Sequence, residues 1–151
     1  MTAASLNKAL GFSTVAAFDA GNLPAVALAL RAKFPDKPIV IAGDDDRAVE
    51  AKQGINPGRT KAEEAAQAVG GVNFLPIFAP AEQAADPKGF TDFNDLATKS
   101  VLGEEAVARQ ARAVVDKAIA QHQQQRLQHD HAQHDQQGKR LEDRPKRSAH
   151  V

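Results

Sequence analysis

The residues that could do chemistry are gathered first in an acidic triplet. Asp44, Asp45 and Asp46 directly follow the apolar run 38–43. Three adjacent like charges repel one another, and neither a strand nor a turn needs all three for its stability. Mg²⁺ is commonly held by one or two carboxylates together with substrate phosphates and water. The triplet therefore predicts a cation site to which Asp44 and Asp46 contribute, and the alternative is a solvated turn in which one aspartate caps the next helix.

A second acidic group lies at 89–96, where Asp92 and Asp95 stand on either side of Asn94. Taken alone, Asp92 or Asn94 could simply cap a helix. If both acidic groups lie at the same edge of a sheet, however, a shared cation site becomes the better interpretation.

Basic and polar residues next to these acids could hold phosphate. Arg47 directly follows the triplet and could form a charge-assisted hydrogen bond to an anion. Residues 56–61 (NPGRTK) include Arg59 and Lys61 and could bind an anion at a helix start. The spacing of a P-loop is absent, so an ordinary turn followed by a helix cap is the favoured alternative there.

Three short apolar runs predict the strands that would position these residues, at 14–19, 38–43 and 72–77. Pro76 cannot donate to a strand ladder, which indicates a strand end or edge. A short helix at the start of the chain would carry Leu6, Ala9 and Leu10.

Helical patterns separate the strands. The first is expected to begin at a cap on Asn22 and to stop before Pro35, the second to begin at Thr60 and stop at 70–71, and the third to run from about Gly103 past Lys117. Their apolar stripes are Leu23, Val26, Leu30 and Phe34, then Ala62, Ala65, Ala66 and Val69, then Val107, Ala111, Val114 and Ala118.

The resulting α-β-α-β-α-β-α order predicts an α/β fold with a parallel sheet covered by helices on both faces. Ligands of such folds bind at the carboxyl ends of the strands, which here means residues 19–22, 43–47 and those that follow Ile77. Because the chain begins with a helix, we expect that one preceding strand is missing.

Composition excludes several function classes. The 151 residues contain 19 Lys+Arg and 19 Asp+Glu, so bulk charge does not favour nucleic acid or membrane. The absence of cysteine excludes disulfides, thiolate metal sites and a cysteine nucleophile. No apolar run is long enough to cross a membrane and no secretory signal is evident, so the cytoplasm is the expected compartment.

The chain changes character near residue 120. We predict a globular domain over 1–120, a polar helical extension over 121–137 that is rich in Gln and His, and a disordered basic tail over 138–151. The histidines are interleaved with glutamine, which is typical of adventitious metal affinity rather than of a dedicated site.

Taken together, the motifs resemble the Toprim domain, a Rossmann-like catalytic fold of bacterial-type DNA primases and topoisomerases, and most of all that of plasmid and phage primases. Residues 44–48 (DDDRA) are similar to the family's Asp-x-Asp motif in its primase form. Residues 17–23 resemble the strand-to-helix turn of this subgroup, 56–66 its next helix, and 92–96 (DFNDL) its later acidic motif. The resemblance covers about 2–118.

This resemblance implies a primase that uses Mg²⁺ or Mn²⁺, with single-stranded DNA as template and nucleoside triphosphates as substrates. Asp44, Asp46, Asp92 and Asp95 would be the metal ligands. Together with the possible anion site at 56–61, the candidates for contacting phosphate or nucleic acid are Asn22, Arg47, Arg59 and Lys61.

One family feature has no counterpart. The family carries a catalytic Glu, in a Glu-Gly pair at the end of its first strand, and no acidic residue precedes Asp19 here. We therefore expect a Toprim domain that lacks its first strand and contains no catalytic residue, is inactive alone, and would need the missing N-terminal part of the primase as a partner.

Other functions are compatible with the same residues. The first is a non-catalytic module that binds divalent cations and nucleic acid through the basic tail. The second is a receiver-like signalling domain, which also places Asp at strand ends, although its acidic pair follows the first strand. The third is an adaptor built around the helix at 103–137.

Overall fold

A two-stranded parallel sheet lies at the centre of the computed structural model, which describes residues 6–7 and 19–142. β1 (Val40–Ala42) pairs with β2 (Val72–Phe74), so that Val40 lies opposite Val72 and Ala42 opposite Phe74. Both strands fall inside the runs predicted for them. β2 ends before Pro76, as the missing N–H of proline predicts.

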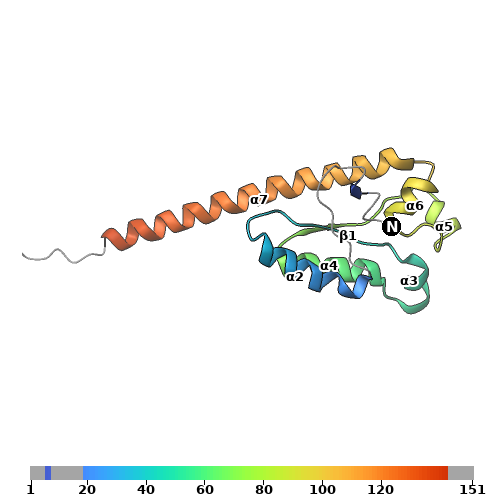
Figure 1. The fold of residues 1–151 in the computed structure, drawn as a ribbon, viewed down its shortest axis with the longest axis horizontal. Coiled ribbons are helices and arrows are strands. Elements are labelled where there is room, and N and C mark those ends of the chain that lie inside the picture. Colours follow the sequence, from blue (N-terminus) through green and yellow to red (C-terminus); the bar gives the residue numbers. More distant parts are fainter. Residues whose placement is uncertain (1–5, 8–18, 143–151) are drawn as a thin grey trace, which may run out of the picture.

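Helices precede, connect and follow these strands (Figure 1). The short α3, α5 and α6 were not among the predicted helices, whereas α2, α4 and α7 were. No helix in the described part of the chain is long and apolar enough to cross a membrane. The elements are the 3-10 helix η1 (Ala20–Asn22), α2 (Leu23–Lys33), α3 (Arg47–Gln53), α4 (Pro57–Val69), α5 (Glu82–Ala85), α6 (Phe93–Thr98) and α7 (Gly103–Glu142).

Helices α2 and α4 cover one face of the sheet (Figure 1). The stripe predicted on α4 is fully buried there and packs against Ile41 of β1 and Ala27 of α2. Most of these residues are alanines, whose small side chains let the two helices and the strand approach closely. On α2 itself the buried residue is Ala27, while Phe34 of the predicted stripe is exposed.

Helices α6 and α7 lie over the opposite face. Phe93, Leu96 and Val107 are completely buried between them, and the ring of Phe93 lies 4.8 Å from that of Phe74 in β2. Leu6 joins this cluster, as expected for the first helix. The stripe predicted on α7 is confirmed, because Val107, Ala111 and Ala118 are buried and Val114 is half-buried.

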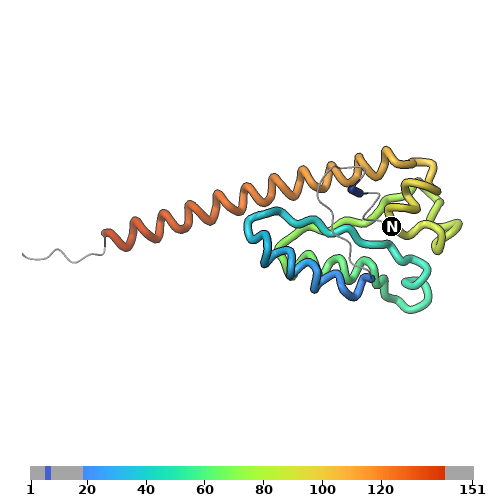
Figure 2. The backbone as a smooth tube through the Cα atoms, in the orientation of Figure 1, coloured from blue at the N-terminus to red at the C-terminus, as the bar shows by residue number. Residues whose placement is uncertain are grey.

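Beyond the sheet, α7 continues as a projecting arm (Figure 2). His122 Nε2 lies 2.6 Å from the carbonyl oxygen of Asp36, and residues 123–141 are exposed. The predicted polar extension is therefore helical. The helix also includes residues 138–142, so the disordered tail predicted over 138–151 does not begin at 138, and 143–151 lie outside the described residues.

One predicted helix cap is wrong and another is right in position only. Asn22 occupies the N-cap position of α2 as predicted, but its side chain makes no capping bond there and instead donates to Asp19. Helix α4 begins at Pro57 rather than near Thr60, and Asn56 caps it by accepting from Arg59 N at 3.2 Å. Proline is well suited to a first helical position, where its missing N–H has no helical partner.

Some predicted elements cannot be assessed. The predicted first strand, 14–19, lies outside the described residues except for Asp19, whose side chain caps η1. Of the helix expected at the start, Leu6 is helical, and Ala9 and Leu10 lie outside the described residues.

The close approach of α4 to the end of β1 generates a prediction. A Cβ on Gly43 would lie 2.6 Å from the Cβ of Ala62 and 2.9 Å from Leu75. We expect Gly43→Ala to lower the free energy of unfolding by about 2 kcal/mol in urea denaturation, because a buried helix must move.

The matched control is Gly138→Ala in the arm. A Cβ there meets nothing within 4 Å, so the same change should be neutral or raise helix stability by up to about 1 kcal/mol. Equal stability of Gly43→Ala and the unchanged protein would contradict the packing described here.

Candidate metal and nucleotide site

The two acidic groups meet at the carboxyl end of β1. Residues 44–46 follow the strand, and the backbone N–H of Asp45 donates to the carbonyl oxygen of Thr91 at 2.8 Å. This bond joins the first acidic turn to the loop that carries Asp92 and Asp95. The structure therefore brings the two groups predicted from sequence to one edge of the sheet.

Among these carboxyl groups, that of Asp44 has the raised pKa. Burial, followed by the negative charges of Asp92 and Asp46, raises the pKa of the Asp44 carboxyl from 3.8 to about 6. Asp95 adds to the same effect. A bound cation would reverse this effect, because a positive charge favours the ionised form of a carboxyl group.

The other three candidate ligands also hold the local backbone. Asp46 Oδ2 accepts from Gly58 N at 2.9 Å, at the start of α4. Asp92 and Asp95 form a capping box at the start of α6, in which Asp92 Oδ1 accepts from Asp95 N at 2.7 Å. The helix-cap alternative is therefore realised for Asp92.

Asp95 has further partners. Its Oδ1 forms an ion pair with Lys99 Nζ at 2.7 Å, and its Oδ2 accepts from the backbone and hydroxyl of Thr91. Burial would raise the pKa of Asp95, but the hydrogen bonds from Lys99, Thr91 and Asp92 outweigh it and keep this pKa below its ordinary value. Asp95 is therefore ionised at neutral pH and contributes to the negative potential at Asp44.

The carboxylates fit an open cation site rather than a closed cage. Within the described residues, no three acidic or histidine side chains converge closely enough to hold a metal ion by themselves. A site of one or two carboxylates, completed by substrate phosphates and water, is the usual arrangement for Mg²⁺. Asp44, crowded by Asp92 and Asp46, suits that arrangement.

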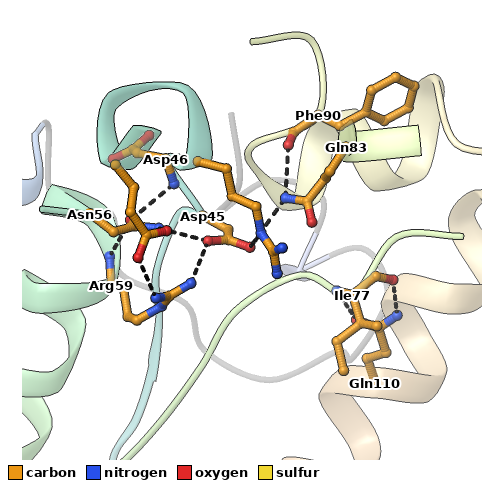
Figure 3. A network of polar contacts seen from close by, with 10 residues as sticks. Asp45, Asp46, Asn56, Arg59, Ile77, Gln83, Phe90 and Gln110 are labelled. Atoms are coloured by element: carbon orange, nitrogen blue, oxygen red, sulfur yellow. Dashed lines mark hydrogen bonds and ion pairs between the residues drawn. The ribbon is translucent and has the colours of Figure 1, made fainter. Parts of the chain in front are cut away.

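Asp45 is the residue that sequence reasoning missed. Its side chain is 4% exposed and holds four side chains from different parts of the chain (Figure 3). The acidic triplet was the only sequence signal for Asp45. If Asp44 and Asp46 are taken as the metal ligands, the residue between them has no assigned role. The four donors are Arg47 at 2.9 Å, Asn56 at 2.7 Å, Arg59 at 3.0 Å and Gln83 at 3.1 Å.

The net effect on Asp45 is opposite to that on Asp44. Burial would raise the pKa of the Asp45 carboxyl, but hydrogen bonds from Arg47, Gln83 and Asn56 outweigh it and hold the pKa below its ordinary value. Adjacent carboxylates of one turn thus differ in charge environment: the pKa of Asp44 is raised and that of Asp45 is lowered.

The start of α4 contacts negatively charged groups, and these groups belong to the protein's own acidic turn. Asn56 donates to Asp45 and accepts from the backbone of Asp46, and Gly58 donates to the carboxylate of Asp46. A Cβ on Gly58 would lie only 2.3 Å from the carbonyl oxygen of Asp44, so glycine is required for this contact. The residues 56–61 therefore form the predicted turn and cap, although Asn56 rather than Thr60 is the capping residue.

The predicted phosphate-binding residues are divided by the structure. Arg47 and Arg59 both lie at the acidic turn, where Arg59 also pairs with Glu50 at 3.1 Å. Lys61 pairs with Glu64 along the exposed side of α4, and Asn22 interacts with Asp19. The structure therefore brings Arg47 and Arg59 together at the acidic turn. Lys61 and Asn22 make these contacts with other residues.

A cavity of about 430 Å³ opens beside Asp45, Arg47 and Arg59. Its other lining residues are Gln83, Ala84 and the loop 75–81 that follows β2. The four candidate metal ligands are not among the lining residues. The carboxyl end of the sheet therefore offers a carboxylate cluster and a separate arginine-lined cavity.

Comparisons with known proteins point to one family. Residues 1–103 match the Toprim domain, and the match ends where α7 begins. One DNA primase TraC of Escherichia coli is 44% identical, over 78% of this chain and 16% of its own length. A second is 42% identical, over 99% of this chain and 14% of its own length. The chain thus spans less than a fifth of either relative. No solved structure gives a significant match.

The raised pKa of Asp44 predicts a stabilising substitution. Its folded pKa of about 6 exceeds the ordinary 3.8, so this group favours the folded state at low pH, and that contribution is lost as the pH rises through 6. In metal-free buffer at pH 7.5, Asp44→Asn should raise the free energy of unfolding by about 1–3 kcal/mol. Asp116→Asn on the exposed side of α7 is the control. A destabilised Asp44→Asn protein would contradict the assignment.

The neighbouring residue should respond in the opposite direction. Asp45→Asn should lower the free energy of unfolding at pH 7.5 by about 2 kcal/mol, because two arginines lose their carboxylate partner. Since the pKa of Asp45 is depressed, the difference should shrink as the pH falls below 3.8. Urea denaturation at several pH values measures both substitutions, and equal effects at positions 44 and 45 would refute this division of roles.

Proposed function

Because this chain belongs to the Toprim domain family, we propose that it forms the cation-binding part of a DNA primase. The reaction is synthesis of an RNA primer on single-stranded DNA from nucleoside triphosphates, in plasmid replication or conjugative transfer. The similarity to two DNA primases supports this proposal, and 99% of the chain aligns with one of them.

One observation carries the proposal: the half-buried carboxyl group of Asp44, at the end of β1, is destabilised as an anion by burial and by the negative charges of Asp92, Asp46 and Asp95. Like charges of this kind destabilise the folded protein unless a cation neutralises them. A turn needed only for the fold would have no reason to include Asp44, because Asp45 and Asp46 already make the contacts that fix α4.

The proposed ion is Mg²⁺ or Mn²⁺, held by Asp44 with Asp46, Asp92 and Asp95. When bound, the ion would neutralise negative charge on the triphosphate as the primer oxygen attacks. Arg47 and Arg59 line the cavity next to Asp45, and their guanidinium groups suit phosphate oxygens. Contacts from Asn22 and Lys61 to nucleic acid stay predictions.

We further propose that catalysis requires a Glu-Gly pair at a strand end, as the family resemblance implies; residues 1–18 contain no Asp or Glu. The second candidate function is a non-catalytic module that binds divalent cations and nucleic acid, and it uses the same carboxylates without such an acid.

Primer synthesis by a fusion protein separates the two functions. A strand ending in Glu-Gly is added ahead of Thr2, and incorporation of labelled ribonucleotides is measured on a single-stranded DNA template with Mg²⁺ or Mn²⁺. The primase proposal predicts template-dependent incorporation that falls at least a hundredfold in Asp44→Ala and Asp46→Ala.

Asp116→Ala, on the exposed side of α7, is the matched control and should retain the incorporation. Binding of single-stranded DNA without incorporation, in a fusion protein whose fold is intact by circular dichroism, would overturn the primase proposal. That result would favour the non-catalytic module.

A further inference from the structure

We propose that the cavity beside Asp45 binds one nucleoside phosphate, and that it does so without a metal ion. The phosphate contacts Arg47 and Arg59, and the base lies against the loop 75–81. This inference deepens the proposed function, on which it rests, by assigning the substrate a binding site separate from the carboxylate cluster.

The polar side of the cavity suits phosphate. Its charged lining residues are Arg47, Arg59 and the single carboxylate of Asp45. Asp45 uses one oxygen for each arginine, so both guanidinium groups are held before any ligand arrives. Arg47 uses only Nε for this contact, and in the described part of the chain its two terminal nitrogens make no hydrogen bond. Those two nitrogens of Arg47 suit a paired contact with phosphate oxygens. Both terminal nitrogens of Arg59 already contact Glu50 and Asp45, so Arg59 contributes mainly positive charge at the rim of the cavity.

The opposite side is apolar and rigid. Leu75, Pro76, Ile77, Phe78, Ala79, Pro80 and Ala81 line it without any charged side chain. The side chain of Ile77 is available to a ligand, because Ile77 is 70% exposed. An apolar wall of this kind suits the flat face of a nucleobase, and the chain has no Trp or Tyr to offer instead.

Two sets of hydrogen bonds fix the loop 75–81. Gln110 of α7 donates to the carbonyl of Ile77 at 2.8 Å and accepts from its N–H at 2.9 Å, as a neighbouring strand would (Figure 3). Glu82 accepts from Ala79 N and from Ser100, and so ties the loop to the turn before α7. The loop is therefore fixed by side chains that do not line its ligand-facing side, and little ordering cost remains for binding.

The size and position of the cavity agree with one nucleotide. A volume of about 430 Å³ lies in the range of small-molecule sites. Asp44 and Asp45 are adjacent, yet only Asp45 lines the cavity. A nucleotide bound here would therefore lie next to the proposed cation site and would not depend on the ion.

Titration of the chain with AMP in EDTA, followed by amide and arginine Nε–H NMR signals, tests the proposal. We expect shifts in Ile77, Ala79, Gln83 and the Nε–H of Arg47 and Arg59. Arg47→Ala should weaken AMP binding at least tenfold, and circular dichroism checks that the fold is retained while Asp45 keeps Asn56, Arg59 and Gln83 as partners. Ile77→Ser should weaken AMP binding about tenfold while leaving binding of inorganic phosphate unchanged.

The control variant is Arg112→Ala, an exposed arginine of α7 outside the cavity, and it should bind AMP as the unchanged chain does. Absence of shifts at millimolar AMP, or binding that appears only with Mg²⁺ and centres on Asp44, would overturn the cavity proposal and leave the primase proposal standing. Equal AMP affinity in Arg47→Ala would also overturn it. Failure of primer synthesis, by contrast, would leave metal-free AMP binding at the cavity as it is.

Discussion

The buried carboxylate of Asp45 is the contact on which the rest of the site depends. It receives hydrogen bonds from two arginines, an asparagine and a glutamine that come from α3, the start of α4 and α5. A buried charge is tolerated only when such partners compensate it, and here the compensation also fixes where each partner lies. The turn after β1 is therefore fixed to the start of α4 on one side and to α5 on the other.

Because the contacts of Asp45 fix this turn, the turn can include Asp44 even though the charge of Asp44 destabilises the folded state. Asp44 is held among other carboxylates by a turn that its own charge does not stabilise, and its raised pKa reflects the imbalance. Asp45 and Asp46 make the contacts to α4, and Gly58 lets the helix start approach the backbone of Asp44. Sites for charged ligands commonly store strain of this kind and release it when the ligand binds.

The spacing of apolar residues and the positions of proline and glycine were enough to predict much of this fold. The stripe of Ala62, Ala65, Ala66 and Val69 marked the face of α4 that is buried, and Pro76 marked the end of β2. The prediction that both acidic groups would meet at one edge is also correct, although only the first group follows a strand end. The second lies at the start of α6 and is joined to the first by the bond from Asp45 N to Thr91 O.

The parts that sequence did not predict depend on long-range contacts. The pair Asn56-Pro57 is itself a local signal for a helix start, whereas the bonds of the Asn56 amide with Asp45 and Asp46 are long-range and no local pattern reveals them. The cavity depends on Gln110 holding Ile77 from 33 residues away. The role of Asp45 likewise follows from Gln83, 38 residues along the chain.

The central claim is that the two acidic groups form one cation site, and a Mn²⁺ titration observed by amide NMR tests it most directly. Paramagnetic broadening acts only near the bound ion and needs no substrate. The account predicts early broadening in residues 43–47 and 92–95 together. Broadening confined to the histidine-rich arm at 122–134, or no selective broadening, would contradict it.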